Sequence, residues 1–339
     1  MKLFVQIPCL NEERTLPEVI RDIPRTIEGI DEVRILVIDD GSADRTAEVA
    51  HRAGADYVMR LPFTQGLAKA FAHGIAACLE LGAEIIVNTD GDHQYRGSDI
   101  PRLIQPILDG RAEVVIGNRE VSQVEYFSPL KRKLQVLGST VVSKLSHVDV
   151  PDATSGFRAY SRDAALRMNV FSNFSYTLET LFLAGNHRIP ITHVPIQVNK
   201  PLRPSRLFSN LLTYLKKSAA TILRMYTLYE PLRSFFYAGS FIFAIGLVAV
   251  LRFLYYYFTG AGSGHVQSLV LSGALLTIGF QIWVVGILAD LISINRRLNE
   301  EILYRLKRND PVLAEHASET LSRPVRNLLP SKKIKTSTV

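Results

Sequence analysis

An acidic motif at residues 88–94 is the part of this 339-residue chain best suited to chemistry. Asp90 and Asp92 are one residue apart and directly follow an apolar run that predicts a strand ending near Thr89. Two carboxylates so placed can share a hard divalent cation, and oxygen ligands of this kind suit Mg²⁺ or Mn²⁺. The alternative is a solvated acidic turn, which Asp next to Gly also favours. The motif predicts a metal site, and its context strengthens that interpretation.

Two further polar segments follow predicted strands. Asp39, Asp40, Gly41 and Ser42 come after the strand at 34–38, and residues 8–12 (Pro-Cys-Leu-Asn-Glu) come after the first strand. A carboxylate there can accept hydrogen bonds from a base N–H or from ribose hydroxyls. Taken alone, Asp-Asp-Gly-Ser is an ordinary β-turn. Three such segments at strand ends indicate one shared crevice.

The elements that must position these residues alternate between short β-rich runs and helical patterns. Alternation of this kind predicts a mostly parallel sheet whose ligands bind beyond the carboxyl ends of the strands. A Thr15-x-x-Glu18 capping box and an apolar helical pattern at 66–81 predict two of the covering helices. The predicted strands are residues 3–7, 34–38, 57–60, 84–89 and 113–117.

Composition and missing motifs exclude several classes of function. There is no Gly-Lys-Ser/Thr phosphate loop and no Gly-x-Gly-x-x-Gly opening a helix, which argues against the usual kinase and dinucleotide-binding readings. Two cysteines, Cys9 and Cys78, are too few for a disulfide framework or a zinc site, so a reducing compartment is expected. The net charge of +7 cannot by itself identify a partner. Nucleic acid is disfavoured because the basic residues gather around two apolar segments.

Those apolar segments, residues 235–258 and 268–289, are each long enough to cross a bilayer, with only Arg252 charged. The connection at 260–265 contains no Lys or Arg, whereas both outer flanks are basic. The positive-inside rule therefore predicts a membrane hairpin with both termini in the cytoplasm. A basic amphipathic helix on the membrane surface is predicted at 206–226, with an ordinary core-facing helix as the alternative. Residues 1–7 lack a cleavage pattern and do not fit a signal peptide, and residues 309–339 are expected to form a mobile tail.

Together these motifs resemble family 2 glycosyltransferases of the GT-A fold, and within them the dolichyl- or polyprenyl-phosphate mannose and glucose synthase group. The resemblance extends from Lys2 to the end of the second apolar segment. It implies an α/β fold with four regions. These are a cytoplasmic GT-A domain at 1–205, interface helices at 206–232, a transmembrane hairpin at 233–294 and a basic, partly disordered tail at 295–339.

The resemblance also assigns roles to residues that match the family's motifs. It places Asp90, Asp92 and Gln94 on the metal, and it makes Asp90, Asp92, Arg119, Arg132 and Arg158 the catalytic set. Arg119, Arg132, Ser139, Ser155 and Arg158 would contact the acceptor phosphate, and Glu179 is an acidic neighbour. Thr64 and Arg96 depart from the family pattern, which leaves the donor sugar open. The donor nucleotide would contact Pro8, Leu10, Asn11, Glu12, Asp39, Asp40, Lys69, Asp90, Gly91, Asp92 and, from the basic loop at 200–206, Arg206.

The implied reaction transfers a sugar from a UDP- or GDP-sugar to a polyprenyl phosphate, with inversion and with Mg²⁺ or Mn²⁺. A lipid phosphate is already an anion, so no general base is needed and catalysis can be mostly electrostatic. One alternative is a polysaccharide synthase or a transferase acting on another lipid, although the single tryptophan, Trp283, lies in an apolar segment rather than in a Gln-x-x-Arg-Trp motif. The other is a catalytically silent membrane scaffold that binds nucleotide-sugar. A homo-oligomer is expected by resemblance only.

Overall fold

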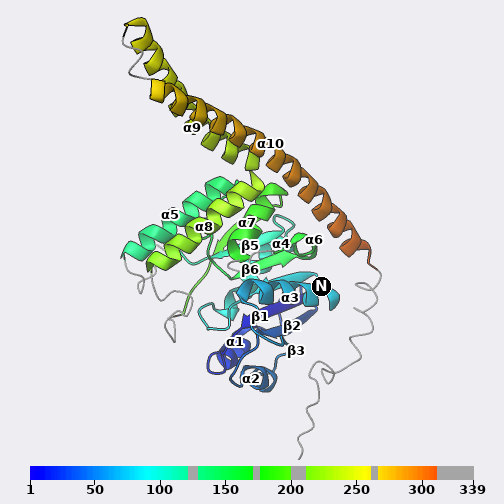
Figure 1. The fold of residues 1–339 in the computed structure, drawn as a ribbon. Coiled ribbons are helices and arrows are strands. Elements are labelled where there is room, and N and C mark those ends of the chain that lie inside the picture. The colour runs from blue at the N-terminus through cyan, green and yellow to red at the C-terminus, as the bar shows by residue number, and fades with distance from the viewer. Residues whose placement is uncertain (121–128, 171–175, 200–210, 261–265, 311–339) are drawn as a thin grey trace, which may run out of the picture. The chain divides into compact units, whose positions relative to one another are not determined.

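The computed structural model describes residues 1–120, 129–170, 176–199, 211–260 and 266–310 (Figure 1). Its contacts divide the chain into two compact units. The first contains Met1–Tyr214 together with the chain from Leu303 onward, and the second contains Leu215–Ile302. The sheet and the candidate site belong to the first unit, and the long apolar helices make up most of the second.

A seven-stranded sheet with the order β3-β2-β1-β4-β6-β5-β7 forms the centre of the first unit. All five predicted strands are present. The sequence missed β6, which runs antiparallel to β4 and β5, and β7, which runs parallel to β5. The sheet is therefore mostly parallel, as the α/β class requires. The strands are β1 (Lys2–Cys9), β2 (Glu32–Asp39), β3 (Tyr57–Arg60), β4 (Ile85–Asn88), β5 (Val114–Asn118), β6 (Arg158–Ser161) and β7 (Ile191–Pro195).

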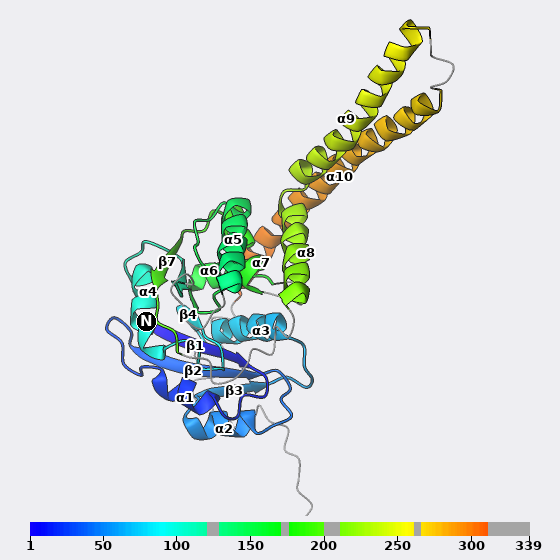
Figure 2. The ribbon, with the colours of Figure 1, turned by 90° about the vertical axis from the view of Figure 1, so that its left-hand side faces the viewer.

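Helices cover both faces of this sheet, which explains why β1 is apolar and buried on both sides along nearly its whole length (Figure 2). One face packs against α1, α2 and α4 in a single hydrophobic core. The other packs against α3, where Gly74 lets the helix approach Gln6 and Ile38 closely. The helices are α1 (Leu16–Asp22), α2 (Thr46–Ala53), α3 (Leu67–Glu80), α4 (Ile100–Leu108), α5 (Pro129–Ser146), α6 (Arg162–Arg167) and α7 (Tyr176–Asn186), with a 3-10 turn η1 (Gly97–Asp99).

The predicted capping box at the start of α1 is wrong, although the helix does begin there. Thr15 makes no side-chain cap. Its hydroxyl lies 2.8 Å from the Glu12 carboxylate and 2.7 Å from the carbonyl oxygen of Gly91. The side chain thus joins two loops at the end of the sheet, a long-range contact that replaces the local cap.

The second unit is largely helical and contains α9 (Pro231–Phe258), most of α8 (Leu211–Tyr229), and α10 (Val266–Asn309) as far as Ile302. Both predicted spans are helices long and apolar enough to cross a membrane, and only 11% of each apolar window is buried in the protein. Gly239 allows Trp283 to approach α9, and the Trp283 indole N–H lies 3.3 Å from the carbonyl of Phe236. The amphipathic prediction at 206–226 lies partly outside the described residues. Residues 295–309, predicted as tail, are instead the end of α10.

Candidate active site at the carboxyl ends of the strands

The candidate site lies where β1 and β4 are neighbours, the point at which the strand order of an open sheet reverses. After β1 the chain builds outward through β2 and β3 and then returns to β4 on the other side of β1. Cys9 pairs with Asp39 and Gln6 pairs with Asn88, so the ends of the three strands are aligned. Ligands bind at such switch points in α/β sheets. The three polar segments predicted from the sequence meet at this edge.

Hydrogen bonds between loops fix the segment that follows β1. The backbone N–H of Asn11 donates to Ser42 Oγ at 2.8 Å, and Asn11 Oδ1 accepts from the N–H of Ala43 at 2.8 Å. The N–H of Glu12 donates to Thr46 Oγ1 at 2.9 Å. Asn11 has a φ of 55°, in the left-handed region that Asn tolerates better than most residues. The loop that carries the buried Glu12 is thereby held at the carboxyl end of β1.

The neighbouring acids Asp39 and Asp40 have different environments. Both oxygens of Asp40 accept backbone N–H groups, from Gln65 at 2.7 Å and Gly66 at 2.8 Å, and so hold the start of α3. Asp39 Oδ1 accepts the N–H of Ser42 at 2.9 Å. Its Oδ2 is buried 3.4 Å from Arg60 Nε and has no hydrogen-bond partner among the described residues. Asp40 thus has both oxygens bonded to the backbone, whereas one oxygen of Asp39 has only the ion pair with Arg60.

Negative charge is concentrated around Asp90. Burial, together with the charges of Asp92 and Glu12, raises the pKa of this carboxyl to about 7. No group of three or more His, Cys, Asp or Glu side chains in the described part of the chain forms a complete metal cage. Mg²⁺ is usually bound by one or two carboxylates together with substrate phosphates, so the pair Asp90 and Asp92 fits a divalent cation completed by a ligand.

A buried polar network lies next to Asp90. The Asn88 amide donates to the carbonyl of Gly156 at 2.8 Å and to the Tyr176 hydroxyl at 2.9 Å, and it accepts from Gln6 at 2.9 Å. A Cβ on Gly156 would lie 2.9 Å from Asp90 Oδ2 and 2.8 Å from the Tyr176 hydroxyl. Sequence reasoning missed the role of Tyr176, which lies on α7 and matches no motif.

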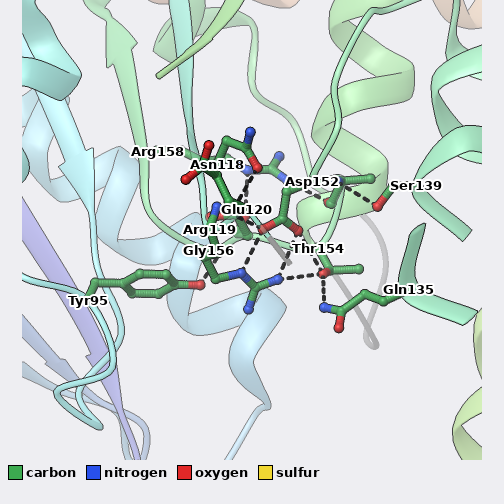
Figure 3. A network of polar contacts seen from close by, with 12 residues as sticks. Tyr95, Asn118, Arg119, Glu120, Gln135, Ser139, Asp152, Thr154, Gly156 and Arg158 are labelled. Carbon is green, nitrogen blue, oxygen red and sulfur yellow. Dashed lines mark hydrogen bonds and ion pairs between the residues drawn. The ribbon is translucent and has the colours of Figure 1, made fainter. Parts of the chain in front are cut away.

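A second network holds Arg119, the residue after β5 (Figure 3). Its guanidinium donates to the two oxygens of Asp152 at 2.7 and 2.9 Å and to Thr154 Oγ1 at 2.7 Å. The Gln135 amide on α5 donates to the same Thr154 oxygen at 2.9 Å. Burial disfavours the charge on Asp152, yet Arg119 holds the pKa of that carboxyl below its usual value. The result is a buried, bidentate ion pair. No motif in the sequence indicated a role for Gln135.

Arg158 occupies an environment that conflicts with its expected phosphate contact. Its side chain is fully buried and donates to the carbonyl oxygens of Ser155, Thr177 and Ala153, each at 2.8 to 2.9 Å. It also donates to Thr180 Oγ1 at 2.8 Å. With its donors used inside the protein, Arg158 orders the loop before β6 and joins it to α7.

The two serines expected at the acceptor are also buried. Ser139 Oγ on α5 accepts the N–H of Ala153 at 3.2 Å and so anchors the same loop. Ser155 is fully buried, and its Oγ has no hydrogen-bond partner among the described residues. Arg132 is half-buried on α5.

The remaining predicted residues lie around the crevice or outside the described part. The Asp92 carboxylate accepts the N–H of Gln94 at 3.1 Å. Pro8 and Gly91 are buried, while Leu10, Lys69 and Gln94 are half-buried. Arg206 and the basic loop at 200–206 lie outside the described residues.

Comparison with known proteins assigns this chain to a family. The model of glycosyl transferase family 2 matches residues 4–167. A dolichyl-phosphate hexose transferase of Haloferax volcanii is 32% identical over 194 residues, which cover 57% of this chain and 81% of that protein. Glycosyltransferase AglJ of the same organism is 28% identical over 307 residues, 87% of this chain and 95% of that protein. The chain belongs to glycosyl transferase family 2 and is a glycosyltransferase.

Two further comparisons support the same assignment. A UDP-N-acetylglucosamine–dolichyl-phosphate N-acetylglucosaminyltransferase of Methanococcus voltae is 29% identical over 219 residues, 58% of this chain and 84% of that protein. Glucosyl-3-phosphoglycerate synthase of Mycobacterium tuberculosis, solved with Mn²⁺, UDP and its product, matches with a TM-score of 0.50 at 23% identity. That match covers 67% of this chain and 78% of the other, and it shows a common GT-A fold.

Proposed function

We propose that this glycosyltransferase moves a monosaccharide from a nucleotide-sugar onto a polyprenyl phosphate at a membrane. The observation that carries the proposal is one edge of the sheet with two unlike sides. Asp90, Asp92 and Glu12 make one side acidic, and the buried Arg119 lies close enough to Asp90 to lower its pKa, against the dominant effect of burial. Relatives named as dolichyl-phosphate sugar transferases support the acceptor class.

The donor diphosphate is assigned to the acidic side. Asp90 and Asp92 would hold a divalent cation, with Gln94 beside them. When bound, the cation neutralises the charge that grows on the leaving nucleoside diphosphate. Asp39, with one buried oxygen lacking a hydrogen-bond partner among the described residues, is placed to accept from the nucleoside, and Asn11 and Glu12 line the adjoining loop.

The acceptor phosphate is assigned to the side of Arg119. A phosphate monoester is an anion at neutral pH, so it can attack the anomeric carbon without first losing a proton to the enzyme. Arg119 supplies a fixed positive charge near the attacking group, and Asp152 holds it in place. A single displacement of this kind inverts the anomeric configuration.

The surface beside this acceptor side suits a lipid. The helix that carries Gln135 presents Val136, Leu137 and Val141 outward, exposed by 45%, 60% and 37%. Apolar side chains next to a phosphate site favour an acceptor with a hydrocarbon chain.

The hairpin of α9 and α10 would anchor the enzyme. The loop at 260–265 has no Lys or Arg, while Arg233 precedes α9's apolar window and Arg296 and Arg297 follow that of α10. Under the positive-inside rule the catalytic unit faces the cytoplasm. Labelling of an introduced surface cysteine in sealed vesicles tests this topology.

The test of function is a donor and acceptor panel with the purified full chain. UDP- and GDP-sugars are each combined with a polyprenyl phosphate and Mg²⁺ or Mn²⁺, and lipid-linked monosaccharide is measured. We expect product with one pair and none with the neutral polyprenol, which lacks the nucleophile. Product on a glycan but on no lipid phosphate would contradict the proposed acceptor.

A further inference from the structure

The turn that carries Asp92 and Gln94 has an uncommon backbone conformation. His93 lies between these two residues and has a φ of 59°, in the left-handed region. A residue with a Cβ is uncommon there and keeps this conformation where its surroundings hold it. Within the turn, the N–H of Gln94 donates to the Asp92 carboxylate at 3.1 Å. This bond ties the carboxylate to the shape of the turn, so a group that fixes the turn also fixes Asp92.

Support for the turn comes from Asn199, which lies shortly after β7 and is 106 residues from His93 in the sequence. The backbone N–H of Asn199 donates to the carbonyl oxygen of Gln94 at 2.9 Å. Its side-chain amide donates to the carbonyl oxygen of His93 at 3.2 Å. Val198 forms a β-bridge with Tyr95, which extends the contact by one residue. One residue therefore holds two adjacent carbonyl groups of the turn.

Arg96 sets the direction in which the Asn199 amide points. Its Nε donates to Asn199 Oδ1 at 3.0 Å, and another nitrogen of the guanidinium donates to Gln197 Oε1. A guanidinium has donors only, so the oxygen of the Asn199 amide faces Arg96 and its NH₂ group faces His93. Arg96 departs from the family pattern, and the proposed transfer gives it no role.

Both the turn and the segment that supports it are fixed to the sheet. The N–H of Ile196 donates to the carbonyl oxygen of Asn118, the last residue of β5, at 2.9 Å. The hydroxyl of Tyr95 accepts the N–H of Gly156, just before β6, at 2.9 Å (Figure 3). Strands β5 and β6 are neighbours, so the sheet itself sets the position of Asn199 relative to the turn.

We propose that Asn199, oriented by Arg96, is a positioning residue for the divalent cation, because it holds the turn from which Asp92 reaches the cation. Mg²⁺ requires near-ideal octahedral geometry, so a small displacement of one ligand weakens its binding. Loss of a residue that holds a metal ligand typically lowers metal affinity by about 10–100-fold. The inference rests on the cation site of the proposed function and concerns the donor side only.

Binding of Mn²⁺ to the purified full chain with UDP or GDP, measured by calorimetry, tests the proposal without any transfer reaction. We expect Asn199→Ala to weaken Mn²⁺ binding by about tenfold. Equal Mn²⁺ affinity in this variant and in the parent chain overturns the proposal.

The matched control is Asn169→Ala, which should bind Mn²⁺ as the parent chain does. Asn169 is also half-buried and bonds through its side chain to the carbonyl of Arg167 and to Lys307. It follows α6, which begins beside Glu84 at the opposite end of β4 from the site. Equal weakening of Mn²⁺ binding in the Asn169 and Asn199 variants would show a general effect on the fold and overturn the proposal.

A rescue experiment separates positioning from a general loss of stability. Glycine adopts a positive φ about as readily as a negative one, so His93→Gly allows the turn to form with less outside support. In the Asn199→Ala chain we expect His93→Gly to recover at least about threefold of the lost Mn²⁺ affinity, because it removes the cost of the left-handed conformation. A double variant that binds Mn²⁺ no better than Asn199→Ala alone overturns the proposal.

Arg96→Met is a milder variant that leaves Asn199 in place and carries the test if Asn199→Ala does not fold. We expect it to weaken Mn²⁺ binding by about threefold, the effect of losing one hydrogen bond. Unchanged Mn²⁺ binding in Arg96→Met overturns the role of Arg96. Intact Mn²⁺ binding with no product on any lipid phosphate contradicts the proposed acceptor alone, so the two proposals fail separately.

Discussion

The two sides of the crevice are built in different ways. The acidic side consists of short segments that each follow a strand, and burial and crowding of its carboxylates raise the pKa of Asp90 in spite of the nearby Arg119. The other side joins Arg119, Thr154 and Gln135 from three separate segments around Asp152, with every charge matched. The first, unmatched side therefore carries an excess of negative charge that a bound cation would offset, whereas the second, matched side holds its arginine in place with a carboxylate of the protein.

The largest effect on stability is expected from breaking the matched side. In Asp152→Asn the buried Arg119 loses its counter-charge, and removing one partner of a buried pair typically costs about 3–5 kcal/mol. The measurement is the thermal or denaturant midpoint in detergent. Asp109→Asn, which removes an exposed pair with Arg111, should stay within about 0.5 kcal/mol of the parent chain. Equal effects of the two variants would remove the distinction between the sides.

The unmatched side should show the opposite pattern, a loss of function with little loss of stability. Asp92→Asn keeps the shape of the side chain but halves the charge available to a cation. We expect turnover to fall by about 10²–10³-fold or more, as for loss of one group that stabilises transition-state charge. Metal-dependent donor binding, followed by calorimetry, should disappear as well. Near-normal turnover would take the cation out of the mechanism.

Gly156 lies where the two sides meet and should respond in both measurements. A methyl group in Gly156→Ala would press on the Asp90 carboxylate and the Tyr176 hydroxyl, and overpacking of this kind costs about 1–3 kcal/mol. Donor affinity should fall together with the midpoint. The matched control is Gly138→Ala on α5, where a Cβ meets nothing within 4 Å, so stability should be unchanged or rise by about 0.5–1 kcal/mol.

The smallest effect is expected for Thr154, at the edge of the hydrogen-bond network around Asp152. Thr154→Val removes the hydroxyl shared by Arg119 and Gln135, and one such hydrogen bond contributes about 0.5–1.5 kcal/mol. Combined with Gln135→Leu, the loss should be smaller than the sum of the two single losses. Strict additivity in this double-mutant cycle would show that the two side chains act independently.

The acidic side could be predicted from the sequence, because its residues directly follow strands that the sequence pattern itself indicates. Carboxyl ends of parallel strands meet at one edge, so polar segments after strands converge wherever the sheet forms. The grouping of Asp90 with Glu12 follows from that rule, whereas the two apolar helices follow from the length and hydropathy of their segments. The failed prediction on this side came from a long-range contact, since the Thr15 hydroxyl donates to the carbonyl of Gly91 and does not cap the helix.

Only the tertiary structure decided which partners each charged group has once it is buried. Nothing in the motif distinguishes Arg119, held at the crevice by Asp152, from Arg158, whose donors are used by carbonyls inside the fold. The contact of Tyr304 with Asp163 was likewise hidden, because it forms only when α6 lies beside the end of α10. A sequence fixes which groups carry charge and how they recur along a helix. Which of them are matched internally, and which face outward to a ligand, depends on neighbours that are distant in the sequence.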